Sequence, residues 1–144
     1  TVRARFMASY RLEGGWSLGG ATVLDMLGRG GGWQGDVGVG HQGRLGAGTT
    51  WGSGVALAFA GDRNLQTYFG VTEEQAARTG YPVYEPRTGL RDITAHVNAR
   101  TPLVDHWHVF YGASLSRLLG PAAASPLPRR TSTWGLNAGL AYRF

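Results

Sequence analysis

Cysteine is absent from this sequence, which excludes a disulfide framework and any metal site built on thiolates. Charge is scarce as well: Lys, Arg, Asp and Glu together make up 16% of the residues, compared with about 25% in ordinary soluble domains. The longest apolar segment, TTWGSGVALAFA at 49–60, is too short for a membrane-spanning helix, which needs roughly 18 apolar residues. A membrane location would therefore require a closed β-sheet, because lipid offers no partners for free backbone groups.

The basic residues do not gather into a nucleic-acid site. The formal net charge is +5, but most arginines stand singly among other residues, and Arg129 and Arg130 are the only adjacent pair. Nucleic-acid-binding proteins concentrate their positive charge on one face or helix, so we expect no nucleic-acid partner. Thr1 is not followed by a basic start and an apolar run, so no signal peptide is visible, and we expect a mature or truncated form.

Glycine and regular alternation are what the sequence has in abundance. It contains 24 glycines, and seven segments alternate apolar with small or polar residues at a period of two, which predicts strands. These segments span 1–12, 16–27, 33–42, 49–60, 90–101, 107–118 and 131–144. A threonine N-cap, early glutamates and a terminal glycine in TEEQAARTG at 72–80 predict one short helix.

The connections between these segments alternate between short turns and longer loops, as in bacterial outer-membrane barrels. We therefore predict an all-β fold, an antiparallel transmembrane up-and-down β-barrel. It forms one domain over residues 1–144, with long extracellular loops at 61–88 and 119–130. The chain could also hold only the C-terminal strands of a larger barrel.

The two faces of each strand predict which side meets lipid. In the closing segment TWGLNAGLAYRF, Trp134, Leu136 and Leu140 share one face, while glycine, alanine, asparagine and arginine occupy the other. A soluble sandwich core built from the second face would be mostly void and would bury unpaired arginines. The predicted lumen-lining residues are Arg3, Arg5, Asp36, Asp92, Arg100 and Arg143, and the arginines of the first strand are expected to pair with Asp25, Asp36 and Asp92.

Aromatic residues fall near the ends of the predicted strands, where membrane barrels carry interfacial girdles. They are Trp16, Trp33, Trp51, Trp107, Trp134, Tyr10, Tyr142 and Phe144. The strand count is seven, whereas single-chain bacterial barrels have an even number of at least eight. Either LQTYFGV at 65–71 contributes another strand, or N-terminal strands precede this sequence.

Three separated motifs resemble the MipA/OmpV family of outer-membrane proteins, which are related to the MltA-interacting scaffolding protein. They are QTYFGVTEEQAARTGYPVYEPRTGLRD, RLLGPAAASPL and the ending GLAYRF, and the similarity runs from Thr1 to Phe144. The resemblance implies that this region is the C-terminal part of a longer barrel. The sequence departs from the family pattern at Pro121 and Ala124, where acidic residues are expected.

The resemblance also implies partners and an assembly signal. The family's scaffold role suggests peptidoglycan-remodelling enzymes, or another membrane complex, as partners in addition to outer-membrane lipid. Leu140, Tyr142 and Phe144 resemble the C-terminal signal that the barrel-assembly machinery recognises during biogenesis.

Enzymatic chemistry is not expected, because no nucleophile and base lie close together in the sequence. We likewise expect no catalytic residue, cofactor or metal; His106 and His108 form only a lone HxH, a weak metal signal. The alternative function is a small porin-like channel with a basic lumen. The candidate interaction surface on the long loops consists of Tyr68, Phe69, Arg117, Ser125 and Pro126, although Tyr68 and Phe69 could instead fold inward and plug the lumen mouth.

Overall fold

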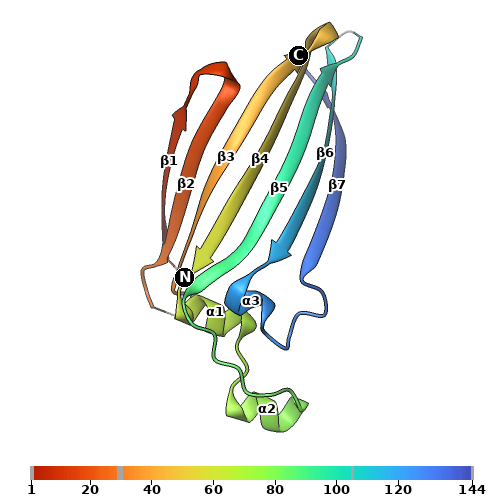
Figure 1. The fold of residues 1–144 in the computed structure, drawn as a ribbon. Helices are drawn as coiled ribbons and strands as arrows, with labels where there is room; N and C mark the ends of the chain where they lie inside the picture. Colours follow the sequence, from red (N-terminus) through yellow and green to blue (C-terminus); the bar gives the residue numbers. More distant parts are fainter. Residues whose placement is uncertain (1, 29–30, 105, 144) are drawn as a thin grey trace.

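Seven strands form one antiparallel sheet in the computed structural model, which describes residues 2–28, 31–104 and 106–143 (Figure 1). Each strand pairs with its neighbours in the chain, in the order β1 to β7. The strands are β1 (Arg3–Arg11), β2 (Trp16–Asp25), β3 (Trp33–Leu45), β4 (Thr49–Ala60), β5 (Gly89–Pro102), β6 (Trp107–Leu118) and β7 (Ser132–Tyr142). The helices are α1 (Asp62–Phe69), α2 (Glu73–Thr79) and α3 (Gly120–Ala123), with short 3-10 turns at Glu13–Gly15 and Gly46–Gly48. The predicted all-β antiparallel fold is confirmed.

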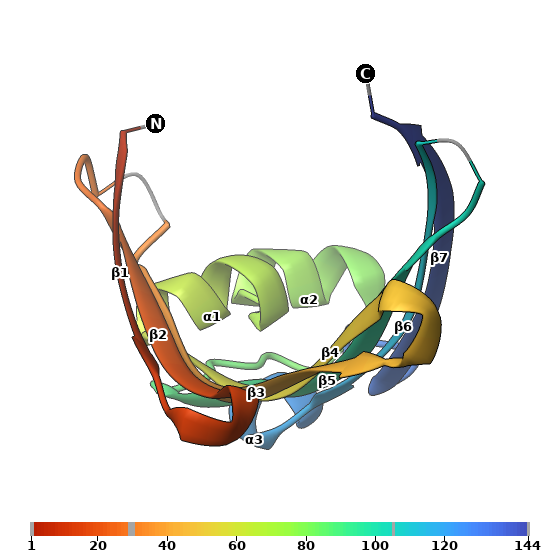
Figure 2. The same cartoon turned by 90° about the horizontal axis from the view of Figure 1, so that it is seen from above.

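The sheet is curved into a trough and does not close on itself (Figure 2). β1 and β7 are its two edges, and no pairing joins them within the described ranges. This shape is consistent with an up-and-down barrel that is open along one side. The sequential strand order agrees with this shape. The predicted separation of short turns from long loops also agrees with it, since the short turns all lie at one end of the sheet and α1, α2 and α3 lie at the other.

Glycine makes the tight turn between β1 and β2 possible. Gly14 and Gly15 have φ values of 71° and 84°, a left-handed conformation that side chains with a Cβ rarely adopt. A Cβ on Gly15 would also collide with the carbonyl oxygen of Gln42 on β3. The turn can therefore pack against the neighbouring hairpin only because residue 15 has no side chain.

The suggestion that LQTYFGV adds a strand is wrong, because Asp62–Phe69 forms helix α1. Leu65 and Phe69 are four residues apart, so they lie on one face of a helix. Leu65 is buried in a small core with Ala60 at the end of β4, and Phe69 packs against that core. The helix stops at Gly70, whose N–H donates to the carbonyl of Gln66. Burial of the helix face that carries Leu65 and Phe69 therefore favours a helix over an additional strand in this segment.

The predicted helix at 72–80 is confirmed as α2, Glu73–Thr79. Thr72 caps it: its hydroxyl accepts from the N–H of Gln75, and the Gln75 side chain accepts from the N–H of Thr72. This reciprocal capping box satisfies two donors that a helix start otherwise leaves free. Gly80, with φ 76°, ends the helix.

The well-buried apolar residues gather at the loop end of the sheet rather than along it. Ala60, Leu65 and Ala122 form a small core, with Phe69 and Leu118 packed against it. This core joins the end of β4 to α1 and to the short helix α3, which lies in the predicted loop at 119–130. None of the helices in the described ranges is long and apolar enough to cross a membrane.

Candidate functional site: the concave face and its cavity beneath α1

The strand register sorts the side chains into two chemically different faces. One row crosses all seven strands through paired residues that are small or carry a hydroxyl: Ser9, Gly19, Gly38, Ala56, Thr94, Ser116 and Thr133. The row one residue away in each strand is Tyr10, Leu18, Val39, Val55, Ala95, Leu115 and Trp134. Successive residues of a strand point to opposite faces, so one face is small and polar and the other is apolar.

The small, polar face is the concave one. Arg3, Val23 and Gln34 belong to it by register, and they line a common cavity with Asn64 and Phe69 of α1. Helix α1 lies on the concave side of the trough (Figure 2). The apolar face is therefore convex, and many of its large side chains are exposed: Trp134, for example, is 73% exposed.

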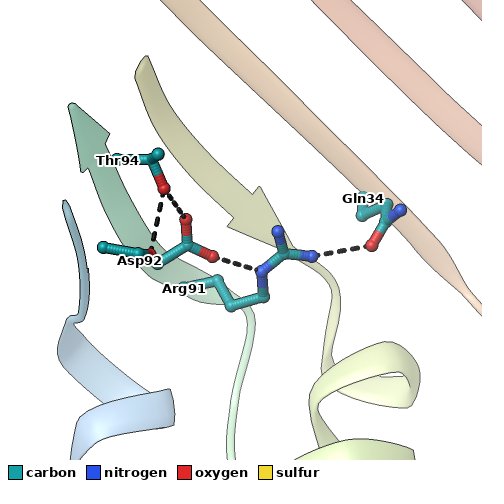
Figure 3. Close-up of polar contacts among 5 residues, drawn as sticks. Gln34, Arg91, Asp92 and Thr94 are labelled. Carbon is teal, nitrogen blue, oxygen red and sulfur yellow. Dashed lines mark hydrogen bonds and ion pairs between the residues drawn. The ribbon is translucent and has the colours of Figure 1, made fainter. Parts of the chain in front are cut away.

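A β-bulge places two charged residues together at the loop end of the concave face. The register of β4 against β5 shifts between Ala58 and Phe59, so that Arg91 has no partner of its own on β4. Bulges commonly redirect a side chain in this way. The Arg91 guanidinium then reaches Asp92 on its own strand and Gln34 on β3 (Figure 3).

The contacts of this pair are short and partly buried. Arg91 Nε donates to Asp92 Oδ2 at 2.6 Å, and Arg91 Nη1 donates to Gln34 Oε1 at 2.7 Å. The Arg91 and Asp92 side chains are 28% and 14% exposed. Thr94 donates to Ser116 on β6 at 3.0 Å and lies 3.4 Å from Asp92 Oδ1. The network thus links β3, β5 and β6 across the concave face.

A cavity of about 250 Å³ lies between this network and helix α1. Its walls include Arg3 and Asp25 from the first hairpin, Gln34, Arg91, and Asn64, Tyr68 and Phe69 from α1. Asn64 is only 5% exposed, and its Nδ2 donates to the carbonyl of Gly31 at 2.7 Å. Its Oδ1 is buried and has no hydrogen-bond partner among the described residues.

Asn64, Gln34 and Arg91 are not recognisable as site residues from the sequence alone. Their roles depend on contacts between strands and on helix α1, which lies in the predicted loop at 61–88. One signal was available for Arg91: with Asp92 it places two charged residues in succession, which interrupts the alternation of β5.

The five predicted loop residues do not form one exposed surface. Phe69 packs against the loop-end core, and Ser125 is 7% exposed, with its hydroxyl donating to the Phe69 carbonyl at 2.6 Å. Neither side chain therefore belongs to an exposed loop surface, and the interaction role of the five residues stays a prediction. Pro126 is half-buried, Arg117 is exposed on β6, and Tyr68 is exposed at the cavity. Of the two alternatives for Tyr68 and Phe69, the inward position describes Phe69.

The residues predicted to line a lumen lie as follows. Arg3, Arg5, Asp36, Asp92 and Arg100 belong to the concave face by register, whereas Arg143 follows the end of β7 and its N–H donates to the His106 carbonyl. The expected pairing of first-strand arginines with Asp92 is wrong, because the bulge brings Arg91 to that carboxylate. Asp36 makes no ion pair with any other described residue. The Arg100 guanidinium lies over the ring of Phe110, 5.5 Å from its centroid.

Aromatic rings meet at the turn end of the convex face. His41 lies between Trp16 and Trp51, at centroid distances of 4.6 and 5.2 Å. Tyr142 meets Trp107 edge-on at 5.2 Å. Of the predicted assembly signal, Leu140 and Tyr142 are exposed, and Phe144 lies outside the described residues.

One pair of groups could suggest hydrolytic chemistry. His96 and Ser114 are direct register partners on the concave face of β5 and β6. The two side chains diverge, however: the His96 ring covers Gly54 on β4, and the Ser114 hydroxyl leans toward Gly135 on β7. Because the two side chains lean toward different neighbouring strands, this arrangement does not activate the hydroxyl as a nucleophile.

Comparison with known proteins identifies the family. The family model described as "MltA-interacting protein MipA" matches residues 1–144. The chain belongs to the MipA family. Searches of curated proteins and of solved structures gave no match. Membership in the MipA family suggests a protein of the cell envelope that interacts with an envelope enzyme.

Proposed function

We propose that this MipA-family chain forms part of the wall of an outer-membrane β-barrel and acts as a non-enzymatic scaffold for a peptidoglycan-remodelling enzyme. The observation that carries the membrane location is the uncovered apolar row on the convex face, from Tyr10 to Trp134. In water such a continuous patch would be a strong aggregation hazard. Against lipid it is the surface that a membrane barrel presents.

The height of the apolar band supports this location. Trp33 and His41 on β3 are eight residues apart, as are Trp134 and Tyr142 on β7. At about 3.3 Å per residue these pairs span roughly 26 Å along the strand. A tilt of about 40° reduces that to roughly 20 Å across the membrane, close to the apolar band of about 25 Å in outer-membrane barrels.

Strand direction limits how the trough could close in a membrane. All neighbouring strands are antiparallel, so β1 and β7 run in the same direction. An antiparallel closure therefore needs an odd number of further strands, which gives the even total found in bacterial barrels. A second copy in the same membrane orientation would pair β7 with β1 in parallel. We therefore propose that strands other than these seven complete the wall.

The partner enzyme is expected at the short-turn end. Outer-membrane barrels place short turns in the periplasm, where peptidoglycan lies, and the family description names MltA, a murein hydrolase, as the partner. Four apolar side chains are exposed around the turns at this end: Leu12, Leu45, Leu103 and Val104. We name these four residues the turn rim and propose that it contacts the enzyme.

Site-specific crosslinking in intact cells tests this proposal. A photoreactive amino acid is placed at Leu45 or Val104 of the turn rim, and at Tyr81 in the long loop as the matched control. We expect a peptidoglycan-remodelling enzyme to crosslink from the rim positions and not from Tyr81. Crosslinks from Tyr81 alone, or none to such an enzyme from any position, would reject the scaffold role.

A second candidate function is a channel with a basic lumen. Glycines leave a hollow of about 670 Å³ on the concave face near the turn end, bordered by Arg44 and Arg100. If the completed barrel conducts, planar-bilayer recordings should show anion-selective steps, and Arg100→Glu should reduce that selectivity. An absence of conductance would remove this candidate and leave the scaffold unaffected.

A further inference from the structure

We propose that the hollow at the turn end of the concave face is a binding site for an acidic saccharide, a sugar that carries a carboxylate or a phosphate group. The hollow has a volume of about 670 Å³, within the roughly 300–1,000 Å³ of small-molecule sites. Two neighbouring rows of the strand register form its floor. One row supplies positive charge, and the other supplies side-chain amides.

The first row places two arginines on either side of β4. Arg44 on β3 and Arg100 on β5 are both register partners of Thr50, so their backbones are about 10 Å apart. Neither guanidinium forms an ion pair with another described residue. Arg100 lies over the ring of Phe110, 5.5 Å from its centroid, a contact that positions the guanidinium without using its N–H donors. Both arginines can therefore donate to an oxyanion.

The second row lies two residues away along each strand and alternates amides with glycines. Its members are Gln42, Gly52, Asn98, Gly112 and Asn137. A Cβ on Gly52 would lie 3.2 Å from Asn98 Oδ1, and a Cβ on Gly112 would lie 2.6 Å from Asn137 Oδ1, so both asparagine amides lie over bare backbone. Within the described ranges, none of the three amides in this row forms a side-chain hydrogen bond. Each therefore offers donors and an acceptor, which sugar hydroxyls can pair with.

The separation of the two rows selects for a ligand with two kinds of group. Two residues along a strand correspond to roughly 7 Å. A ligand that contacts both rows therefore has its anionic group on one side and several hydroxyl or amide groups on the other. A simple anion would use only the arginines, and a neutral sugar would use only the amides. A sugar with an acidic substituent uses both rows.

Acidic side chains do not oppose an anion here. No aspartate or glutamate is among the described residues that line the hollow. On the same face, Asp36 lies eight residues from Arg44 along β3, and Asp92 lies eight residues from Arg100 along β5. Eight residues correspond to roughly 26 Å, about three Debye lengths at physiological ionic strength. The electrostatic potential in the hollow is therefore dominated by the two arginines.

This site extends the proposed scaffold role, and the identity of its natural ligand rests on that proposal. Outer-membrane barrels place their short turns in the periplasm, so the hollow would open toward peptidoglycan. The glycan strands of peptidoglycan contain a sugar with a carboxylate, N-acetylmuramic acid. A chain that binds this glycan next to the turn rim would hold the substrate close to the enzyme.

Ligand-observed NMR titrations of the purified full-length protein in detergent micelles test the binding. The acidic sugars are N-acetylmuramic acid and N-acetylglucosamine 6-phosphate. N-acetylglucosamine lacks the acidic group, and D-lactate carries the carboxylate without the sugar. We expect one or both acidic sugars to bind, and the other two compounds to bind at least tenfold more weakly. Tighter binding of N-acetylmuramic acid indicates a peptidoglycan glycan as the source, and tighter binding of the phosphate indicates a phosphorylated sugar.

Arg44→Gln and Arg100→Gln are the principal variants, and Arg11→Gln is their matched control. Arg11 has the same charge and also belongs to the concave face by register, but it does not line this hollow. We expect each principal variant to weaken binding of the acidic sugar at least tenfold, and Arg11→Gln to weaken it less than twofold. Asn98→Leu should remove the preference for the acidic sugar over D-lactate, with folding checked by circular dichroism.

Three results would overturn this proposal: no binding of either acidic sugar, equal binding of N-acetylglucosamine, or equal effects of Arg100→Gln and Arg11→Gln. These titrations use neither crosslinking from the turn rim nor conductance. A failure of the saccharide site is therefore distinguishable from a failure of the scaffold or of the channel.

Discussion

Replacing Val37 by arginine tests whether the convex face meets lipid. Val37 lies midway between Trp33 and His41 on β3, and its side chain is 54% exposed. On a water-facing sheet the substitution would change the free energy of unfolding by about 0.5 kcal/mol or less. At the bilayer midplane, arginine on the outer face of a barrel costs about 2–4 kcal/mol. We therefore expect Val37→Arg to lower the folding equilibrium constant about 30- to 1,000-fold.

Leu45→Arg on the same strand provides the control. Leu45 also belongs to the convex face and is 60% exposed, but it lies four residues beyond His41, at the turn end. Near the interface the cost of arginine falls to about 0–1 kcal/mol. The measurement is a urea titration of the full-length protein folded into phospholipid vesicles, followed by tryptophan fluorescence. Similar small effects for both variants would refute the assignment of the convex face to lipid.

Three further predictions concern stability. Arg91→Leu should lower the free energy of unfolding by about 2 kcal/mol, because it leaves the partly buried Asp92 carboxylate unpaired. Adding Asp92→Asn should restore much of this loss in the same urea titration. If the double variant shows no recovery, the ion-pair explanation is contradicted. Thr72→Ala removes the cap of α2, which costs about 1 kcal/mol. Amide hydrogen exchange at residues 73–79 should therefore accelerate about fivefold. Unchanged exchange rates would show that the cap does not stabilise the helix. Gly15→Ala should destabilise by about 2 kcal/mol, because φ is 84° there; a thermal melt equal to that of the unmodified protein would be inconsistent with this turn geometry.

The strands were predictable because alternation persists to their ends. The bounds of β4 and β6, Thr49–Ala60 and Trp107–Leu118, coincide with the predicted segments. In a sheet with one apolar and one small or polar face, the side chains alternate between the two faces along the whole strand. The alternating pattern therefore predicts both the strand and the residues at which it begins and ends. The same alternation assigns each residue to one of the two faces. For this reason the sequence alone could place the glycines on the face opposite the apolar residues.

The helix α1 and the cavity were not predictable in this way. In the sequence, Leu65 and Phe69 fit a short extended segment. The helix is favoured because both residues pack in or against the small core that includes Ala60 and Ala122, which belong to other elements. The bulge at Arg91 changes register by one residue, which local sequence shows only as two successive charges. The sequence gives no sign that Asn64 is buried, and only the structure shows this. Sites made by loop packing on a regular scaffold therefore escape pattern analysis more readily than the scaffold does.

On the convex face, two tryptophan rings lie over glycines, in the space that a side chain would otherwise occupy. Gly43 pairs with Trp51 across β3 and β4 at the turn end, and a Cβ on Gly43 would lie 2.8 Å from the indole nitrogen. At the loop end the Trp33 indole occupies the space over Gly61 in the same way. Rings laid over glycine cover the bare backbone and pin the strand register. Both indoles lie where the apolar band ends, so in the proposed membrane barrel the missing side chains of Gly43 and Gly61 would hold the two rings at the interface, where an amphipathic indole is most stable.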